Sequence, residues 1–417
     1  MKKPYIKRKL EDTISKYLEK REILAIVGPR QAGKTTLLKK VQSELKNSVF
    51  LSFEDREDLE LFERDVKSFA KKYFDRQYVF IDEFQYSKHG GKRLKYLYDT
   101  YPDVKIVISG SSAIDLTVQA IKFLVGRVFV FNLYQLDFEE YLLFKSKEGL
   151  ASYGKYKKSF DIQKDRLDFP QIKDSESKEL KKILDDFILW GGYPRVALAQ
   201  SDDERKTVLK NIYNTYFLRD IRDVLGLTDD FRLSKLVKLL AVQIGQLVSY
   251  NELGSSAGYD YLTLKKYLNV LEKTFICQPI RPYFVNKRKE ITKNPKIYFF
   301  DTGLRNHIVG NFSSLNERDD KGFLLENYIF NQLVKKDMTV NFWRTKQKDE
   351  VDFVVETGGR KIPLESKSVF QKAQMPKGIG MFVSENNSEL AVILNETSSG
   401  RMMENKTKVY ILPHWII

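Results

Sequence analysis

A glycine-rich segment near the start of the chain has the residue types and spacing of a phosphate-binding loop. Residues 28–35 have the sequence GPRQAGKT, which fits the pattern G-x-x-x-x-G-K-[ST]. The apolar run EILAIV precedes it, and TTLLKKVQSEL, which has helical periodicity, follows it. Such glycines let the backbone curl until several N–H groups point at one phosphate, and the helix N-terminus adds partial positive charge. The segment therefore predicts a nucleotide site contacted by Gly28, Pro29, Arg30, Gln31, Ala32, Gly33, Lys34, Thr35 and Thr36.

The residue types in and after this loop make ATP and Mg²⁺ the expected ligands. We expect Lys34 to reach the β- and γ-phosphates and the Thr35 hydroxyl to bind Mg²⁺. Residues 78–83, YVFIDE, are an apolar run that ends in two carboxylates. We expect Asp82 to hold Mg²⁺ through water and Glu83 to polarise the attacking water as general base. The alternative is an acidic pair that only caps the end of a strand.

A second apolar run ends in hydroxyl groups. Residues 105–112 have the sequence KIVISGSS, so Ser109, Ser111 and Ser112 follow a predicted strand. Ser111 is the candidate for sensing the γ-phosphate, although serine is also common wherever a strand leads into a loop.

Acidic and basic residues near the C-terminus have the types that metal-dependent phosphodiester cleavage requires. Glu326 lies in an amphipathic helical pattern, and Asp352 interrupts the apolar run EVDFVV, where a carboxylate is costly unless it is paired or metal-bound. Glu365 and Lys367 are two residues apart and share one face of a strand. We expect Asp352, Glu365 and Glu326 to hold a divalent cation and Lys367 to orient the attacking water. A buried ion network in an inactive fold is the alternative.

This order of helix Glu, strand Asp and strand Glu-x-Lys resembles the PD-(D/E)xK nuclease fold. The proline of the motif is absent before Asp352. Trp343 and Arg344 precede the site and could contact a nucleic acid, but an aromatic residue on the first strand of a small sheet is more often part of the core.

The middle of the chain has the pattern of a winged helix. Helical patterns at 233–246 and 261–276 are separated by breaks at Gly254 and Gly258, and two short β-like runs follow around a basic segment. Lysines and an arginine there can neutralise phosphates without choosing a sequence. The candidate nucleic-acid contacts are Lys265, Lys266, Lys287, Arg288 and Lys289, with Lys293 nearby. The competing interpretation is a module that only packs domains or binds protein.

The elements that must position these residues alternate between strands and helices at the start of the chain. Apolar runs at 23–28, 48–53, 78–82 and 105–110 predict buried strands of a parallel sheet wrapped by helices. The Lys, Ser and Asp-rich stretch from Lys145 to Glu179 reads as an insertion or exposed linker. The last hundred or so residues predict one helix and several strands.

These patterns make an α/β chain with four segments. We expect a P-loop ATPase domain with a parallel sheet at 1–145, a charged insertion and helical lid at 146–226, a winged helix-like domain at 227–310, and an α/β nuclease-like domain at 311–417.

Composition narrows the class of protein. The 417 residues exceed one average domain, and 71 Lys and Arg against 56 Asp and Glu give a net charge of +15. That surplus favours a polyanionic partner, a basic surface kept for solubility being the alternative. A single Cys277 excludes an internal disulfide, and three histidines, His89, His307 and His414, argue against a histidine metal centre. No apolar run is long enough to cross a membrane, so a cytoplasmic protein without membrane association is expected.

The first three motifs together resemble the AAA-type P-loop ATPases. The order of GPRQAGKTTLL, FIDEFQ, SGSS, VGRVFVFNLYQLDFEEYL, WGGYPRV, YFLRDI and DTGLRN further resembles a prokaryotic ATPase family that carries a C-terminal nuclease-like domain. The resemblance implies that Arg127, after Gly126, is a phosphate-sensing or finger arginine, possibly supplied across a homo-oligomer. By itself, Arg127 is equally well a surface arginine at a turn.

The leading hypothesis is a Mg²⁺-dependent ATPase whose nucleotide state moves a winged helix and a nuclease-like domain, acting on nucleic acid, with DNA favoured over RNA. The alternatives are a regulatory ATP-binding switch that hydrolyses slowly, and a DNA-binding scaffold with a vestigial nuclease fold.

Overall fold

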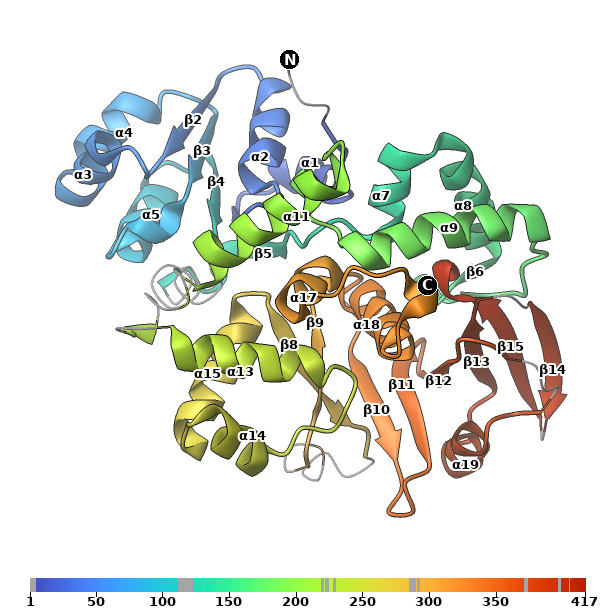
Figure 1. Ribbon diagram of the computed structural model, residues 1–417. Helices are drawn as coiled ribbons and strands as arrows, with labels where there is room; N and C mark the ends of the chain where they lie inside the picture. Colours follow the sequence, from blue (N-terminus) through green and yellow to red (C-terminus); the bar gives the residue numbers. More distant parts are fainter. Residues whose placement is uncertain are drawn as a thin grey trace. The chain divides into compact units, whose positions relative to one another are not determined.

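The structure of the chain is a computed structural model, in which the fold divides into two compact units (Figure 1). The first unit contains residues 1–135 and 269–275, and the second contains 136–268 and 276–417. The residues that the structure describes are 5–111, 123–218, 221, 225–227, 230–284, 290, 293–370, 374–396, 399–404 and 406–417.

The first unit is built around a five-stranded sheet in which every neighbouring pair of strands is parallel. In spatial order the strands are β2 (Ser48–Ser52), β3 (Tyr78–Asp82), β4 (Lys105–Gly110), β1 (Ile23–Val27) and β5 (Val128–Asn132). All four strands predicted from apolar runs are confirmed to within one residue at each end. They were recognisable because a strand covered on both faces carries a continuous apolar run, and β1, for instance, is buried along its whole length.

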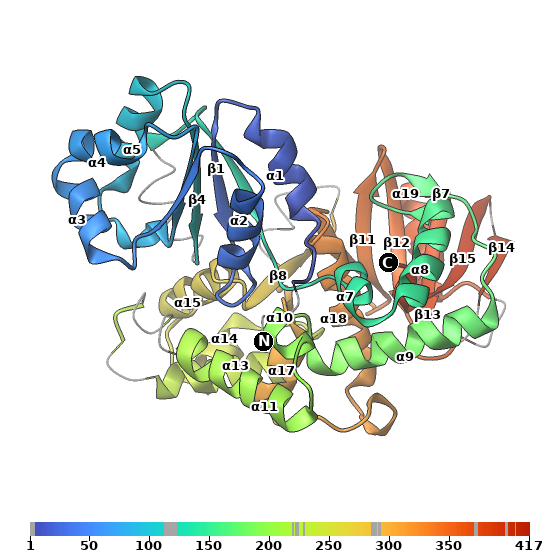
Figure 2. The same cartoon turned by 90° about the horizontal axis from the view of Figure 1, so that it is seen from above.

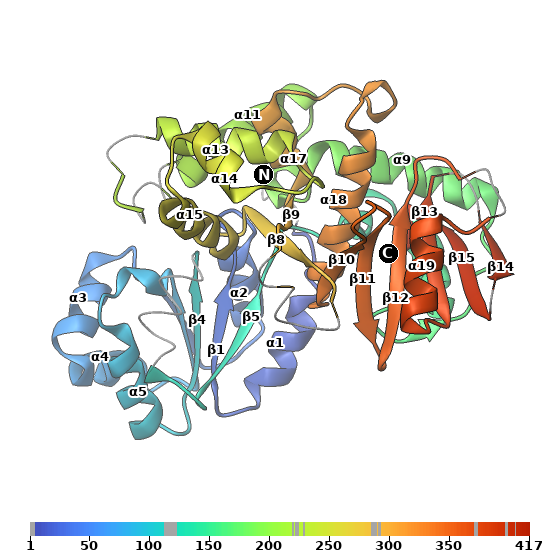
Figure 3. The ribbon, with the colours of Figure 1, turned by 90° about the horizontal axis from the view of Figure 1, so that it is seen from below.

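Helices cover both faces of this sheet, as Figures 2 and 3 show from opposite sides. The helices of the first unit are α1 (Leu10–Leu18), α2 (Lys34–Ser43), α3 (Arg56–Arg64), α4 (Val66–Tyr73) and α5 (Gly90–Thr100), with the short η1 (Phe84–Tyr86). Ile14 of α1 and Leu37 of α2 share a core with Leu24 of β1. Phe62 of α3 and Phe69 of α4 pack their rings 5.1 Å apart in a separate aromatic cluster. The predicted helix-wrapped parallel sheet is therefore confirmed.

The second unit combines helices with a mixed sheet of eight strands. In spatial order the strands are β14 (Gly400–Glu404), β15 (Thr407–Pro413), β13 (Leu390–Asn395), β12 (Arg360–Ser366), β11 (Glu350–Thr357), β10 (Val340–Arg344), β8 (Cys277–Pro282) and β9 (Lys296–Phe299). β8 and β9 form an antiparallel pair, and β8 runs parallel to β10, so the pair is part of the same sheet as the C-terminal strands (Figure 3).

The helices after residue 135 arrange as follows along the chain. They are α7 (Phe138–Lys145), α8 (Lys147–Ser159), α9 (Asp174–Trp190), α10 (Pro194–Ala197), α11 (Asp202–Asn211), the π-helical η3 (Ile212–Leu218), α13 (Phe231–Val242), α14 (Tyr250–Ala257), α15 (Tyr261–Lys273), α17 (Thr302–Val309), η4 (Leu315–Glu317), α18 (Lys321–Val334), α19 (Lys377–Asn386) and η5 (His414–Ile416). A two-stranded hairpin, β6 (Phe160–Asp161) with β7 (Arg166–Leu167), joins α8 to α9.

Two expectations for this unit need correction. The stretch after Lys145 is largely not an exposed linker, because α8 places Tyr153 and Tyr156 three residues apart on one buried face. The C-terminal hundred residues contain α19 as a second helix. Its glycines lower helix propensity, but Gly378 lies so close to the backbone of Glu350 that a Cβ there would collide with the Glu350 carbonyl oxygen.

Two glycine-containing landmarks from distant parts of the chain meet in the second unit. The buried Asp301 carboxylate caps α17 by accepting a hydrogen bond from the Leu304 N–H at 2.8 Å, and it also accepts one from the Gly192 N–H at 2.7 Å. A Cβ on Gly191 would meet this carboxylate, and one on Gly303 would meet the Trp190 carbonyl. The motifs WGG and DTG are therefore glycine-rich because they are in contact.

Candidate functional site

The phosphate-binding loop lies between the end of β1 and the start of α2, where the sequence predicted it. Gly33 has a φ of 97°, in the left-handed region that glycine adopts without strain, and it immediately precedes α2. Gly28 is required for a different reason: a Cβ there would collide with the carbonyl oxygen of Leu133, just after β5. The two glycines of the motif thus fix the turn and its approach to the neighbouring strand.

Lys34 is buried at the base of this loop. Its ammonium donates hydrogen bonds to the carbonyl oxygens of Gly28 and Pro29, both at 2.9 Å. Burial lowers the pKa of Lys34 to about 8, although the carboxylates of Glu83 and Asp82 oppose that shift. A phosphate chain in the loop would supply the negative charge that favours the ammonium.

The end of β3 lies beside the loop through a direct side-chain contact. The Thr35 hydroxyl donates to an oxygen of Asp82 at 2.6 Å, which joins the two expected Mg²⁺ contacts. The Ser109 hydroxyl, at the end of β4, donates to the other Asp82 oxygen. Both oxygens of this buried carboxylate are thus oriented by hydroxyl groups.

Glu83 has a backbone conformation that is unusual for a residue with a side chain. Its φ is 52°, in the left-handed region. The amide of Gln85 donates to the Glu83 carboxylate and, at 3.1 Å, to the Ser111 hydroxyl. Ser111 therefore connects to the expected general base through Gln85, whereas Ser109 contacts Asp82 directly. Ser112, also named from the sequence, lies outside the described residues.

Two contributors were missed by sequence reasoning. Gln85 follows the acidic pair by two residues, and only its contacts reveal its position. Arg8 is buried, and its guanidinium donates to the carbonyl oxygens of Ala32, in the loop, and Tyr134, each at 2.7 Å. The signal available for Arg8 was a basic N-terminal segment, which does not indicate a partner.

Arg127 lies at the opposite edge of the sheet from the phosphate-binding loop. Its carbonyl accepts a hydrogen bond from the N–H of Ile23, the first residue of β1, whereas the loop follows the last residue. The guanidinium forms an ion pair with Asp99 at 3.0 Å. Because β1 spans five residues at about 3.3 Å each, Arg127 does not reach phosphates held in the loop of its own chain. A role towards a second subunit remains a prediction.

The candidate nucleic-acid residues of the middle segment are described only in part. Lys265 and Lys266 are exposed on α15, and the Lys265 ammonium lies 4.5 Å from the centre of the Tyr261 ring. Lys293 is also exposed. Lys287, Arg288 and Lys289 lie outside the described residues.

The C-terminal candidate residues converge on one end of β11 and β12. The antiparallel register that pairs Phe353 with Leu364 places Asp352 and Glu365 at neighbouring positions, as predicted from the sequence. The Ser366 N–H donates to Asp352 at 2.8 Å, and the Lys367 ammonium forms an ion pair with Glu365 at 2.7 Å. Asp352 and Glu365 are both buried.

Glu326 of α18 faces partners that the sequence did not suggest. It accepts a hydrogen bond from the Tyr298 hydroxyl at 2.9 Å and lies 3.8 Å from the ammonium of Lys296. Lys296, on β9, is 3% exposed and also forms an ion pair with Glu350. Burial lowers the pKa of Lys296, but Glu326, Asp352 and Glu350 outweigh burial, so its pKa is raised. Lys296 is therefore an ammonium inside the acidic cluster.

Burial and mutual repulsion raise the pKa values of these carboxyl groups. Burial, followed by the charge of Asp352, raises the pKa of Glu326 to about 8 and that of Glu365 to about 7. Burial also raises the pKa of Asp352. The cluster thus favours added positive charge.

The residues present fit a divalent cation at one position of this cluster. Among the described residues, no group of three or more His, Cys, Asp and Glu side chains has the geometry to hold a metal. Asp352 and Glu365 are nevertheless adjacent hard-oxygen donors, and Mg²⁺ is commonly held by one or two carboxylates plus water. Glu365 also has a buried Oε2 that finds no hydrogen-bond partner within the described part of the chain.

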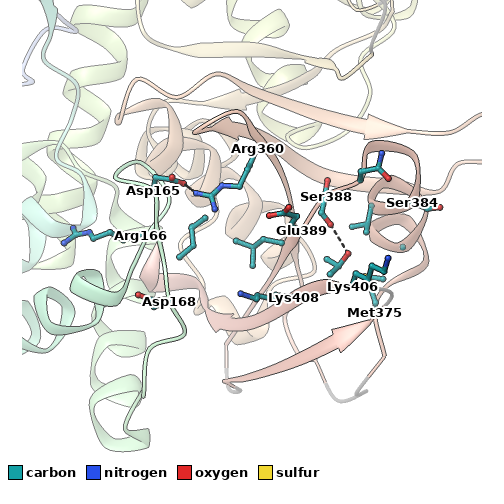
Figure 4. Close-up of a pocket in the computed structure, with 16 residues that line it drawn as sticks. Asp165, Arg166, Asp168, Arg360, Met375, Ser384, Ser388, Glu389, Lys406 and Lys408 are labelled. Atoms are coloured by element: carbon teal, nitrogen blue, oxygen red, sulfur yellow. Dashed lines mark hydrogen bonds and ion pairs between the residues drawn. The ribbon is translucent and has the colours of Figure 1, made fainter.

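Two pockets lie in the C-terminal part of the second unit. One, of about 860 Å³, is lined by Lys367 together with apolar residues such as Phe370 and Met381. The other, of about 930 Å³, lies between the β6–β7 hairpin and the β14–β15 turn (Figure 4). None of the predicted nuclease residues lines the second pocket, and its Arg360 is already paired with Asp165. Only the first pocket adjoins the acidic cluster.

The other residues singled out in the sequence have structural positions. Trp343 packs against Phe382 in the core, with ring centroids 5.7 Å apart, so the core interpretation is confirmed. Cys277 is buried and free. In the described ranges, no helix combines the length and the apolar character needed to cross a bilayer.

Comparison with protein families divides the chain into three matched regions. Residues 20–142 match an AAA domain. Residues 181–315 and 321–415 match two domains of unknown function, DUF8612 and DUF4143 respectively.

Several proteins are similar to this chain over most of its length. An uncharacterized protein of Haemophilus influenzae is 26% identical over 349 residues, which cover 80% of this chain and 79% of that protein. One from Methanocaldococcus jannaschii is 26% identical over 411 residues, covering 89% and 83%. Among solved structures, the Walker-type ATPase PABY2304 of Pyrococcus abyssi is 16% identical, with a TM-score of 0.46, covering 73% of this chain and 96% of that one. AMPPCP-bound DnaA from Aquifex aeolicus is 13% identical, with a TM-score of 0.29, covering 63% and 86%.

The sheet order, the loop and the matched AAA domain define the class of the N-terminal part. It is a P-loop ATPase domain of the AAA type, followed by helices and a C-terminal mixed sheet.

The lowered pKa of Lys34 predicts that nucleotide binding takes up protons. At about pH 9 a large share of Lys34 is neutral in the nucleotide-free protein, and bound phosphates would restore its charge. Calorimetric titration with ATP at that pH, in two buffers of different ionisation enthalpy, should show net proton uptake.

Lys105 provides the matched control, because burial lowers its pKa to about 8 as well. Lys105→Arg should retain the uptake on ATP binding. Binding without proton uptake, or uptake lost in Lys105→Arg, would contradict the assignment to Lys34.

Proposed function

We propose that this chain is a Mg²⁺-dependent ATPase that acts on nucleic acid. The observation that carries the ATPase part is the contact between Thr35 and Asp82, which unites the loop and the acidic strand end in one site. Lys34 would bind the β- and γ-phosphates, and Glu83, held by Gln85, would accept a proton from the attacking water. Bound Mg²⁺ would neutralise charge that develops on the phosphate oxygens.

Substitutions at the loop and at the base should separate nucleotide binding from hydrolysis. Lys34→Ala should abolish measurable ATP binding, because it removes the ammonium that contacts the phosphates. Glu83→Gln should retain binding but lower the turnover rate by about 10²- to 10⁴-fold, since a general base contributes on that scale. Phosphate release and nucleotide titration measure the two effects.

Lys40 is a matched lysine control on the same helix, because it is exposed and pairs only with Glu44 among the printed contacts of α2. Lys40→Ala should leave both quantities unchanged. Hydrolysis that persists at wild-type rate in Lys34→Ala and Glu83→Gln would refute the ATPase proposal. In Arg127→Ala, turnover that falls only where subunits associate would support a role for this arginine in a homo-oligomer.

A winged helix in the middle of the chain is the proposed nucleic-acid contact. The succession of α13, α14, α15 and the antiparallel β8–β9 pair supports this interpretation. A bridge between Leu247 and Lys296 adds a third short β contact before α14. The exposed Lys265 and Lys266, with the chain's net charge of +15, suit a phosphate backbone.

Replacing both lysines of α15 should weaken binding to double-stranded DNA in a salt-dependent way. Each lost phosphate contact lowers the slope of log affinity against log salt by about 0.9, so Lys265→Ala/Lys266→Ala should lower it by about 2. Fluorescence anisotropy at several salt concentrations measures the slope.

The double variant Lys235→Ala/Lys238→Ala is the matched control, because both lysines are exposed on the neighbouring helix α13. It should keep the wild-type slope. Affinity that does not depend on salt, or equal slopes in the two double variants, would argue against contact through α15.

A second candidate function is metal-dependent phosphodiester cleavage in the C-terminal part. It is favoured by the adjacent buried carboxylates of Asp352 and Glu365, with the Lys367 ammonium beside them. The two carboxylates would hold the divalent cation, and Lys367 would orient the attacking water. The pocket that adjoins Lys367 has apolar walls suited to the face of a base.

Cleavage of supercoiled or single-stranded DNA with Mg²⁺ or Mn²⁺ tests this second function. Asp352→Ala and Lys367→Ala should each remove cleavage, because one lacks a metal contact and the other lacks the ammonium. Since burial raises the pKa of Glu365 to about 7, metal binding should strengthen as pH rises through about 7, where the carboxyl proton leaves.

Glu356→Ala is the control, since Glu356 is an exposed carboxylate on the same strand. Cleavage that survives in Asp352→Ala would assign the activity elsewhere. Salt-sensitive DNA binding without any cleavage would instead favour a scaffold with a vestigial nuclease fold.

A further inference from the structure

Lys296 lies where a second cation of the acidic cluster would otherwise be held. Its ammonium contacts Glu350 and lies 3.8 Å from Glu326, so two of the four carboxylates already face a positive charge. The other two, Asp352 and Glu365, are next to each other across β11 and β12. The carboxylates thus divide into one pair with a tethered cation and one pair open to a free cation.

The position of Lys296 is fixed by the fold rather than by a flexible side chain on the surface. It is 3% exposed on β9, and its ammonium lies 5.6 Å from the centre of the Phe342 ring. Tyr298, two residues along the same strand, donates to Glu326 at 2.9 Å. Because β9 pairs with β8 and β8 with β10, the sheet itself brings this lysine to the carboxylates.

Charge balance indicates how many divalent cations the cluster can accept. Four carboxylates, from Glu326, Glu350, Asp352 and Glu365, face three cations within ion-pair range, which are Lys296, Lys367 and Arg344. Four negative and three positive charges leave a net charge of −1. One divalent cation changes this to +1, which a phosphodiester of charge −1 would neutralise, whereas a second would leave +3 before substrate binds.

We propose that Lys296 is a tethered ammonium that takes the place of a second metal ion, so that the C-terminal cluster binds a single divalent cation through Asp352 and Glu365. This rests on the second function proposed above, because it concerns the cation of that site. In sites that use two metals, the ions lie about 3.5–4 Å apart and share carboxylates. Here the ammonium competes for the carboxylates a second ion would need, and Glu326 pairs with Lys296 instead of binding metal.

The stoichiometry of Mn²⁺ binding tests the proposal without relying on cleavage. Free Mn²⁺ is measured by electron paramagnetic resonance during titration of the full chain without nucleotide. The chain carries Thr35→Ala, so that the expected Mg²⁺ contact of the phosphate-binding loop does not contribute. This protein should bind one Mn²⁺, and adding Lys296→Met should allow a second, because it releases Glu326 and Glu350. Lys296→Arg keeps the charge and should still bind one.

Lys361→Met is the matched control, since this lysine lies near the Tyr283 ring on the same strand as Glu365 but away from the cluster. It should bind one Mn²⁺. Two ions bound with Lys296 intact would overturn the proposal, even if Lys296→Met fails to fold. One ion in both the parent and Lys296→Met would overturn it as well.

The same titration distinguishes this inference from the cleavage proposal. If the parent binds no Mn²⁺ but Lys296→Met binds one, metal-dependent cleavage by the natural chain fails, whereas the role of Lys296 as the resident cation is supported. If neither protein binds Mn²⁺, both proposals fail. If the parent binds one ion that Asp352→Ala loses and Lys296→Met binds two, both are supported.

Discussion

The ATPase site depends on one constraint, the parallel direction of the five strands in the first sheet. Parallel strands deliver their carboxyl ends to the same edge, so residues 47 positions apart can meet. The hydrogen bond from Thr35 to Asp82 is the direct consequence, because it joins the loop after β1 to the end of β3 past the intervening β4. Glu83 then adopts its left-handed backbone directly after β3, which is the kind of strained conformation that a surrounding functional site maintains.

Much of this site could be predicted because its signals are local. Continuous apolar runs identify buried strands, and the spacing of Gly28, Gly33 and Lys34 is set by the turn that they form. The contacts of Ser109 and Gln85 could not be predicted, because they depend on which side chain faces Asp82 or Glu83 once the strands have ended. Arg8 could not be predicted either, because its second partner, the carbonyl of Tyr134, lies 126 positions away.

The C-terminal cluster shows a different division between local and distant information. The two-residue spacing of Glu365 and Lys367 predicted a shared face, and the hairpin register then placed Asp352 next to Glu365. Nothing near Lys296 in the sequence indicates that a strand from the middle of the chain joins the C-terminal sheet, so its pairing with Glu350 was not foreseeable. α19 was missed because glycine at 378 argues against a helix locally, although the close packing against the Glu350 backbone requires it.

The two sites handle the cost of buried charge in opposite ways. Lys34 has neutral carbonyl oxygens as its hydrogen-bond partners in the loop, so burial lowers its pKa and the loop is best satisfied when an anion binds. Ligand binding to the native state alone stabilises that state by RT ln(1 + [L]/Kd), and here the stabilisation includes relief of an existing desolvation cost. The C-terminal carboxylates instead have an internal ammonium, because leaving them unpaired in the absence of metal would cost several kcal/mol, about 3–5 for one broken buried pair. The first unit is therefore arranged to respond strongly to its ligand, whereas the cluster in the second unit is largely balanced before any ligand arrives.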